Sequence, residues 1–397
     1  MLRAFGNEVV PIGFHRGAPP VDFVDSIAAI DLGRTFDADF RQRIAMVLRQ
    51  STNLSAWAPR LRDCDVIIAR NLEMLVLGAL ARQRFAPRAS LVYEALDVHR
   101  LLLSQHLVGK AMRQLERVLL RRVDLLIVSS PAFLREYFVP VQALGPSAGV
   151  ATLVVENKMF LGAAATTQTP LVAAAATLPK HGPPWRIGWF GMIRCRKSLD
   201  YLSDLAKRHP RLMELTIRGR PSYTEFKDFD AQIAQTPGLS FGGSYQPFEL
   251  GALYGAVHFN WAIDFFEEGA NSRWLLPNRL YEGGAYRAVP IAIEGTETAA
   301  WLRRRGIGMV LSSLDAVEEF LLRLNPESYA LLKEASLAVP QSAFLVDDHD
   351  NARLLEALHR ARRRHVNSSS RSNQERDLRY TVTLSNEVGR APDDALM

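Results

Sequence analysis

Short apolar runs alternate with longer amphipathic stretches along most of the chain. The runs are Glu8–Phe14, Asp65–Ala69, Leu91–Ala95, Leu125–Ser129 and Thr152–Glu156, followed after a break by Arg186–Phe190, Leu212–Gly219, Val257–Ala262, Val289–Ile293 and Gly308–Leu311. Apolar residues recur at helical spacing in Asp39–Gln50, Ser104–Arg122, Leu199–His209 and Ala316–Leu324. Near-continuous apolar strands that alternate with helices predict an α/β fold with parallel sheets covered on both faces.

The pattern divides the chain into two domains. Residues 161–184 contain small residues, Thr and Pro without a sustained period, which predicts a linker. We therefore expect Rossmann-like domains over residues 1–160 and 185–346. A helix that Asp350 or Asn351 can cap follows over residues 347–366, and the polar, Ser-rich residues 367–397 are predicted to form a disordered tail.

The beginning of the chain departs from the usual pattern of such a domain, which opens on a strand. Leu2–Phe5 followed by Gly6 reads as the last turn of a helix with its glycine cap, and the first strand follows only at Glu8. We therefore expect the N-terminal sheet to lack its first strand, and the gene to extend upstream by about 20 to 30 residues.

Composition and charge narrow the class of protein. None of the apolar runs in the 397 residues approaches the length that spans a bilayer, and Arg3, Glu8 and His15 interrupt any signal peptide. Two distant cysteines, Cys64 and Cys195, exclude a disulfide scaffold and fit a reducing cytosol. The net charge of +6 suggests nucleic acid, a membrane surface or a phosphorylated substrate as partner, although excess Arg can also serve only solubility.

The strongest local signal begins where the strand ending at Phe190 meets Gly191. Three cations follow, Arg194, Arg196 and Lys197, and a helix begins near Ser198. Helix amides together with Arg and Lys form a binding site for a diphosphate. The alternative is a glycine turn followed by surface cations.

A second signal combines a small-residue loop with a helix that opens at Pro277 or Asn278. The loop reads Gly269, Ala270, Asn271, Ser272. Glu282 lies one turn inside the helix, where a carboxylate can accept both hydroxyls of a ribose. A solvated helix glutamate is the alternative.

A third signal follows the strand Leu91–Ala95, at the edge of a parallel sheet where ligands bind. Asp97 and His99 lie there and can orient a substrate or move a proton, although an isolated histidine is more often structural.

A fourth signal is the helix Ser104–Arg122. Its apolar face consists of Leu107, Ala111, Leu115, Val118 and Leu119, and a separate basic stripe consists of Lys110, Arg113, Arg117 and Arg121. Without interleaved aromatic residues this stripe fits anionic lipid better than single-stranded nucleic acid, and a solvated Arg-rich face is the alternative. No metal-binding or nucleic-acid recognition motif is found, so we expect neither a metal nor a nucleic-acid partner.

These stretches resemble the GT-B fold glycosyltransferases of family 4, which are retaining and use nucleotide sugars. The similarity is strongest from Trp185 to Ile293. Within the family the chain is most similar to bacterial enzymes of exopolysaccharide and succinoglycan-type assembly, through the stretches at Tyr93–His99, Val128–Phe133 and Pro277–Glu282.

The resemblance implies two Rossmann-like domains that face a cleft, and a role for each matched residue. Arg194 and Lys197, with Gly191, match the site of the donor diphosphate, and Glu282 matches the glutamate on the ribose. The Gly269–Ser272 loop matches the donor-sugar loop, Asn278 and Arg279 open the helix near the phosphate, and Tyr245 lies in the nucleobase loop. His99, with Asp97 beside it, matches a histidine near the reacting centre, and the last helix matches one that crosses back to the N-terminal domain.

One departure concerns the donor sugar. The family has a second glutamate eight positions before the one matched by Glu282, where this chain has Trp274. Asp264, Glu267 or Glu268 is the candidate to replace it.

The resemblance predicts transfer of a sugar from a nucleotide-diphosphate sugar to a growing, lipid-linked oligosaccharide or other glycan, with retention and without a metal or other cofactor. It also implies a cytoplasmic protein with peripheral contact at the inner face of the plasma membrane. The alternatives are a nucleotide-sugar epimerase on the same fold and a non-catalytic nucleotide-sugar-binding subunit.

Overall fold

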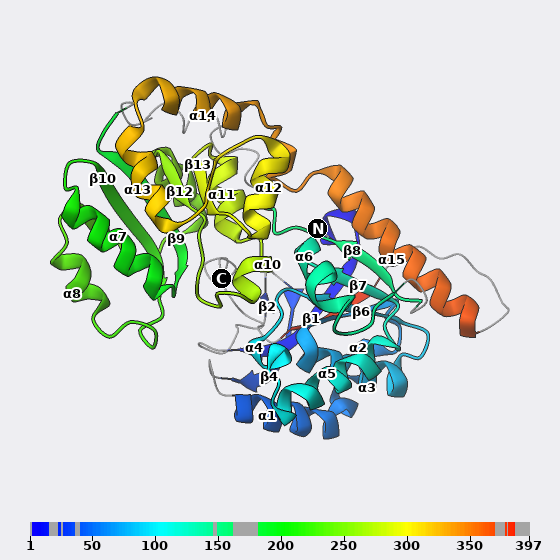
Figure 1. Cartoon of the computed structure of the whole chain (residues 1–397). Coiled ribbons are helices and arrows are strands. Elements are labelled where there is room, and N and C mark those ends of the chain that lie inside the picture. Colours follow the sequence, from blue (N-terminus) through cyan, green and yellow to red (C-terminus); the bar gives the residue numbers. More distant parts are fainter. Residues whose placement is uncertain are drawn as a thin grey trace. The chain divides into compact units, whose positions relative to one another are not determined.

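The computed structural model describes residues 2–15, 23–24, 27–35, 40–145, 149–161, 182–369, 378 and 380–385. These residues form two compact units (Figure 1). Unit 1 combines Met1–Glu156 with Asp348–Ala391, and unit 2 contains Asn157–Asp347. Most of the expected linker, residues 162–181, lies outside the described residues.

A seven-stranded parallel sheet forms the centre of unit 1, with the strand order β4-β1-β15-β5-β6-β7-β8. Its strands are β1 (Glu8–His15), β4 (Ile30–Arg34), β5 (Val66–Arg70), β6 (Ser90–Ala95), β7 (Leu125–Val128), β8 (Ala151–Val154) and β15 (Tyr380–Ser385). A separate antiparallel pair joins β2 (Phe23–Val24) and β3 (Ile27–Ala28).

Helices cover both faces of this sheet. They are η1 (Leu2–Phe5), α1 (Phe40–Thr52), η2 (Leu54–Trp57), α2 (Ala58–Leu61), α3 (Asn71–Phe85), α4 (Arg100–Leu103), α5 (Leu107–Leu120), α6 (Pro131–Phe133), η3 (Leu134–Phe138) and α15 (Asp348–Ser369). Val66 and Ile68 of β5 pack against Leu358 of α15, whereas Ala69 lies below Gly78 of α3. The alternation of side chains along a strand therefore assigns α15 to one face and α3 to the other.

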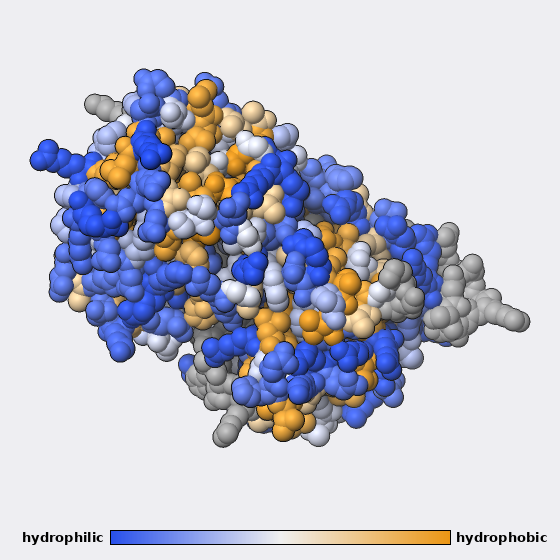
Figure 2. Space-filling model, in the orientation of Figure 1, coloured by the Kyte–Doolittle hydropathy of each residue, from blue (hydrophilic) through white to orange (hydrophobic). Residues whose placement is uncertain are grey.

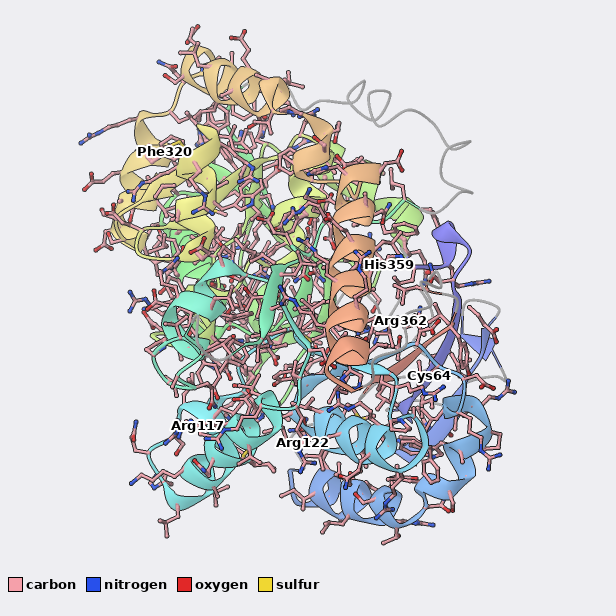
Figure 3. The ribbon with its side chains drawn as sticks, turned by 90° about the vertical axis from the view of Figure 1, so that its right-hand side faces the viewer. Cys64, Arg117, Arg122, Phe320, His359 and Arg362 are labelled. Carbon is pink, nitrogen blue, oxygen red and sulfur yellow. The ribbon has the colours of Figure 1, made fainter. Side chains whose placement is uncertain are left out.

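The long helix α15 is tied to the beginning of β5 by an ion pair. The Arg362 guanidinium lies 2.6 Å from the Asp65 carboxylate, and Figure 3 shows Arg362 on the side of α15 that faces the segment carrying Cys64. The helix packs against β6, β7 and β8. Residues far apart in the sequence thus share one core.

Strand β15 corrects two expectations. It pairs in parallel with β1 on one side and with β5 on the other, so the place of the first strand is filled by residues from near the other end of the sequence. The predicted tail over 367–397 is also wrong for the described part, since α15 continues to Ser369 and Val382 and Leu384 are fully buried. The segment Tyr380–Ser385 alternates β-branched and apolar residues, but its polar surroundings hid this signal.

Unit 2 contains a six-stranded parallel sheet with the order β11-β10-β9-β12-β13-β14. The strands are β9 (Trp185–Ile193), β10 (Met213–Pro221), β11 (Leu239–Phe241), β12 (Phe259–Trp261), β13 (Val289–Ile293) and β14 (Met309–Leu311). Trp185, Trp189 and Trp261 are fully buried in its core. The core fixes the strands, so their carboxyl ends can hold a site in place.

The helices of unit 2 connect these strands in α/β order. They are α7 (Arg196–Arg208), α8 (Phe229–Ala234), η7 (Pro247–Glu249), α9 (Leu250–Gly255), α10 (Asn271–Trp274), α11 (Asn278–Ala285), α12 (Glu297–Arg305), α13 (Leu314–Arg323), α14 (Pro326–Ala338) and η8 (Gln341–Ala343). The α/β prediction is confirmed in both units.

Candidate functional site

The predicted diphosphate loop lies at the carboxyl end of β9, the central strand of unit 2. Gly191 has φ +105° and pairs with Gly219 of β10, which has φ +132°. A Cβ on Gly219 would lie 1.8 Å from the Gly191 carbonyl oxygen. Two glycines are therefore required for the strands to approach this closely where the loop begins.

Arg194 and Lys197 both face the loop that follows β12. The Arg194 guanidinium lies 4.5 Å from the centre of the Phe266 ring and 3.8 Å from the Asp264 carboxylate. The Lys197 ammonium lies 4.4 Å from the centre of the Phe265 ring. The structure thus brings the two predicted cations to one loop, each beside an aromatic face that attracts positive charge.

Lys197 also has an acidic partner. Its ammonium lies 2.7 and 2.9 Å from the two carboxylate oxygens of Glu268, and both side chains are about half exposed. An exposed pair of this kind adds little to stability, because water and salt screen it. Lys197 can therefore exchange this partner for an anionic ligand.

The thiol of Cys195 connects the two loops. It accepts hydrogen bonds from the backbone N–H groups of Ser198 (3.4 Å) and Phe265 (3.3 Å), and it caps α7. Burial raises the pKa of this thiol. Cys195, Phe265 and Phe266 were not predicted as site residues, because their contacts join two loops that are far apart in the sequence.

Asp264 organises the loop that contains the predicted donor-sugar residues. Its carboxylate accepts hydrogen bonds from the backbone of Phe266 (2.8 Å) and from the Ser272 hydroxyl (3.4 Å), and lies 3.7 Å from Arg279. Ser272 and Asn271 are buried. Of the predicted loop residues, Ser272 thus holds the loop together.

Gly269 and Ala270, the other two residues of this loop, shape its turn. Asp264 and Glu268 are candidates for the carboxylate that the family has at the position of Trp274. Gly269 has φ +80°, and Ala270 caps the short helix α10 that ends at Trp274. Asp264 and Glu268 both lie next to the predicted diphosphate cations. Glu267, the third candidate, donates its backbone N–H to the Ser272 hydroxyl (2.9 Å), and a role for any of the three carboxylates at the donor sugar stays a prediction.

Glu282 lies in α11 and is 3% exposed. Its carboxylate accepts a hydrogen bond of 3.0 Å from the Tyr254 hydroxyl. Burial raises the pKa of Glu282 to about 7, although the Tyr254 hydrogen bond and the charge of Arg279 oppose the rise. Glu282 is therefore poised to gain or lose a proton near neutral pH.

Tyr245, predicted in the nucleobase loop, is a buried residue that packs edge-on against Phe190. Its hydroxyl has no hydrogen-bond partner among the described residues. Burial and the nearby Glu282 carboxylate raise its pKa. Tyr245 therefore lines the same core region as Glu282.

Asn278 and Arg279 open α11, after Pro277. The Arg279 guanidinium donates a hydrogen bond to the backbone oxygen of Ile263 (3.1 Å), and the Arg279 carbonyl accepts one from the Asn260 side chain (2.5 Å). These bonds fix the start of the helix beside the loop of Asp264. The predicted residues of unit 2 thus gather at the carboxyl edge of its sheet.

In unit 1, His99 follows the carboxyl end of β6 and caps α4. Its Nδ1 accepts a hydrogen bond from the Leu101 backbone (3.3 Å), which assigns the ring proton to Nε2. Burial and the charge of Arg43 lower the pKa of His99, against the opposing charges of Asp97 and Glu73. The imidazole is therefore neutral near pH 7, and Asp97 is exposed beside it.

The predicted basic stripe on α5 is only partly available to lipid. Arg113 donates hydrogen bonds to the carbonyl oxygens of Leu102 (2.7 Å) and Ser104 (2.6 Å), and Arg117 donates one to that of Val141 (2.6 Å). Figure 3 shows Arg117 on this helix. Arg113 thus binds backbone oxygens at the junction of α4 and α5, and Arg117 binds one in the segment that follows η3. Lys110 and Arg121 remain exposed.

Two features are absent from the described residues, a metal-binding cluster and a membrane-spanning helix. No three His, Cys, Asp or Glu side chains gather closely enough to hold a metal ion. No helix in that part of the chain is long and apolar enough to cross a membrane.

The sheets, their connections and the site at the edge of unit 2 define the fold of the GT-B glycosyltransferases. The sucrose-phosphate synthase of Thermosynechococcus elongatus matches 93% of this chain and 91% of its own, with a TM-score of 0.69 and 14% identity. HepE of Anabaena, in a complex with UDP and glucose, matches 89% of this chain and 99% of its own, with a TM-score of 0.60 and 16% identity. No family model matches the sequence.

The chain belongs to the family of the succinoglycan biosynthesis protein ExoL. It is 42% identical to ExoL of Rhizobium meliloti over 361 residues, which cover 90% of this chain and 88% of that protein. With the fold, this makes the chain a GT-B glycosyltransferase of exopolysaccharide biosynthesis and confirms the predicted class.

Proposed function

We propose that the protein transfers a sugar from a nucleotide-diphosphate donor to a lipid-linked glycan, with retention of configuration, at the inner face of the plasma membrane. The observation that carries the proposal is the pair of cations at the edge of unit 2. Arg194 and Lys197 flank Cys195 in the sequence and face the same loop, through Asp264 and Glu268. They are suited to a ligand with two adjacent negative charges.

The departing diphosphate gives these cations their catalytic role. Negative charge develops on the leaving group as the glycosidic bond breaks, and cations fixed there stabilise the transition state more than the ground state. The exposed Glu268 carboxylate occupies Lys197 in the structure. We propose that the donor diphosphate displaces Glu268, whereas Asp264 keeps its backbone hydrogen bond and stays beside Arg194. No metal is needed for this step.

Glu282 is proposed to bind the ribose. An ionised carboxylate accepts hydrogen bonds from two vicinal hydroxyls, which are stronger than bonds between neutral groups. With a pKa of about 7, Glu282 is ionised in only part of the molecules at neutral pH. Bound ribose hydroxyls therefore favour the ionised form.

We assign the acceptor to unit 1 through His99 and Asp97. The Leu101 backbone donates to Nδ1 of His99, so the free nitrogen of the neutral imidazole is Nε2, which carries the proton. Nε2 can therefore donate a hydrogen bond that orients an acceptor hydroxyl, and Asp97 is the exposed carboxylate beside it, able to accept a proton.

The donor to test first is UDP-glucose, because the neighbour HepE is described in complexes with UDP and with UDP-glucose. The purified protein is incubated with radiolabelled donor and a lipid extract from cells that lack this gene. Label in the lipid fraction supports transfer. Release of a free isomerised sugar without acceptor would indicate an epimerase, and nucleotide binding without turnover would indicate a non-catalytic subunit.

A further inference from the structure

Helix α5 turns its apolar stripe outward. Leu119 of the predicted apolar face is buried, but Leu107 is 84% exposed, Leu115 44% and Val118 41%, and the neighbouring Val108 is 53% exposed. Ala111 lies between them and is also exposed. Because these residues recur every three or four positions, they form one continuous strip along the helix. Figure 2 shows apolar side chains gathered over the lower part of unit 1, where Figure 1 draws α5.

The opposite face of α5 fixes this orientation. Glu116 is fully buried, and its carboxylate accepts hydrogen bonds from the Tyr93 hydroxyl (2.7 Å), the Tyr137 hydroxyl (2.5 Å) and the Gln142 amide (2.5 Å). On the same side, a Cβ on Gly109 would lie 2.4 Å from the Ser104 carbonyl oxygen. Turning the helix to bury its leucines would carry Glu116 away from these donors and leave the buried Tyr93, Tyr137 and Gln142 side chains without their acceptor, which is strongly unfavourable.

The charges around the strip have one sign. Lys110, Arg121 and Arg122 are exposed at its borders, whereas Glu116, the one acidic residue of α5, is buried. Helix α1, which packs on α3 as α5 does, exposes Ile44, Leu48 and Arg49. Two helices of unit 1, α1 and α5, therefore each expose apolar side chains that have cations beside them.

We propose that the α5 strip (Leu107, Val108, Leu115 and Val118) inserts into the interfacial layer of an anionic lipid membrane. Cations at its border favour anionic headgroups, and apolar side chains between them favour the acyl boundary. A second copy of the chain fits less well, because a symmetric contact through α5 sets Lys110 and Arg121 against their own copies. The proposal rests on the proposed function in that its acceptor is lipid-linked, but insertion needs neither donor nor turnover.

Vesicle binding by the full-length protein tests the proposal. Sedimentation with vesicles of phosphatidylcholine and phosphatidylglycerol (3:1) is compared with pure phosphatidylcholine. The double variant Leu107→Ser/Leu115→Ser should lose at least about ten-fold in partition to the anionic vesicles. The matched control is Leu331→Ser, which changes an exposed leucine of α14 in unit 2 (67% exposed), and it should bind like the wild type.

A second variant separates insertion from simple attraction. Lys110→Gln/Arg121→Gln should weaken binding and flatten its dependence on salt, while residual binding persists. Equal vesicle binding by Leu107→Ser/Leu115→Ser and the wild type would overturn the proposal. So would a dimer in sedimentation velocity that this variant abolishes, because a second copy would then cover the strip. Vesicle binding without sugar transfer would leave this inference standing and remove only the proposed function.

Discussion

Glu268 holds the ammonium group of Lys197, one of the two cations proposed to bind the donor diphosphate, at 2.7 and 2.9 Å. On that proposal the carboxylate and the diphosphate compete for one cation. The two side chains are half exposed, so the competition is decided by local charge and hardly by the stability of the fold.

Lys197→Ala should lower kcat/KM by a factor that corresponds to roughly 2 to 4 kcal/mol, because the diphosphate loses a positive charge in the transition state. Glu268→Gln should instead tighten binding of the nucleoside diphosphate if its only role is to occupy Lys197. The control is Lys207→Ala, which removes an exposed lysine from the last turn of the same helix. Steady-state kinetics and calorimetry measure the effects, and equal kinetics of Lys197→Ala and Lys207→Ala would contradict the assignment.

Glu282→Gln should abolish a pH dependence of nucleotide binding. Ribose binding needs the ionised carboxylate, so affinity of the wild type should rise up to about ten-fold per pH unit toward pH 7 and then level off. The nucleotide itself also titrates, and the variant supplies that background. Calorimetry between pH 5 and 8 measures both slopes, and the assignment fails if they are the same.

Glu282→Gln should weaken nucleotide binding but increase the free energy of unfolding at high pH. The pKa of Glu282 in the folded protein, about 7, lies above its ordinary value of 4.5. The folded state therefore binds more protons in this range, and the wild type loses stability as the pH rises from 4.5 to 7. Glu282→Gln should be more stable than the wild type at pH 8 by on the order of 2 to 3 kcal/mol and show no such gain at pH 4. Thermal unfolding at the two pH values measures the difference.

His99→Asn should lower transfer by about 100-fold, without loss of donor binding, because the donor residues lie in unit 2. An asparagine oxygen can still accept the Leu101 hydrogen bond, so the cap of α4 survives and the unfolding temperature should stay close to that of the wild type. His99→Ala removes both roles and serves as the comparison. Transfer by His99→Asn at the wild-type rate would reduce His99 to a capping residue.

Removal of divalent metals should leave transfer within about two-fold of the untreated rate, because Arg194 and Lys197 supply the positive charge that a metal would otherwise bring. The protein is dialysed against EDTA and assayed with labelled donor. A loss of transfer that Mg²⁺ or Mn²⁺ restores would show that the two cations are insufficient.

A chain that ends at Ser369 should be insoluble or unfolded. It lacks β15, so β1 and β5 lose their common partner and expose unpaired strand edges. A chain that ends at Ser385 keeps the strand and is the matched control. Leu384→Ala in the full chain is the milder test, and it should cost about 2 to 5 kcal/mol of unfolding free energy because Leu384 is fully buried. Equal solubility of the chains ending at Ser369 and Ser385 would contradict a structural role for β15.

Local patterns were sufficient to predict most strands and the approach of Arg194 and Lys197 to one edge of unit 2. Arg194, Lys197 and Glu282 were selected because strand ends and helix starts in a parallel sheet share one edge. Phe265 and Phe266 were missed because their partners come from another loop, and a single sequence does not reveal such pairs.

The pairing of β15 and the orientation of α5 could not be predicted from the sequence, for a common physical reason. Strand β15 pairs with segments hundreds of residues away, and no local period predicts which neighbour a strand will take. In α5 the periodicity gave the apolar face correctly, but the hydrogen bonds to Glu116 decide which face points inward. Tertiary contacts override the preference of an isolated helix.

Because β15 lies between β1 and β5, the sheet of unit 1 can be completed only late in synthesis. The backbone of Tyr380 bonds to the side chain of Asp65, 315 residues earlier in the chain. At about 5 to 20 residues per second, a ribosome needs roughly 15 to 60 s between the two. Throughout that interval the nascent β1 and β5 wait without their shared neighbour, while unit 2 already has all of its strands. Unit 2 should therefore fold first, and nascent unit 1 should depend on chaperones until residue 385 leaves the ribosome.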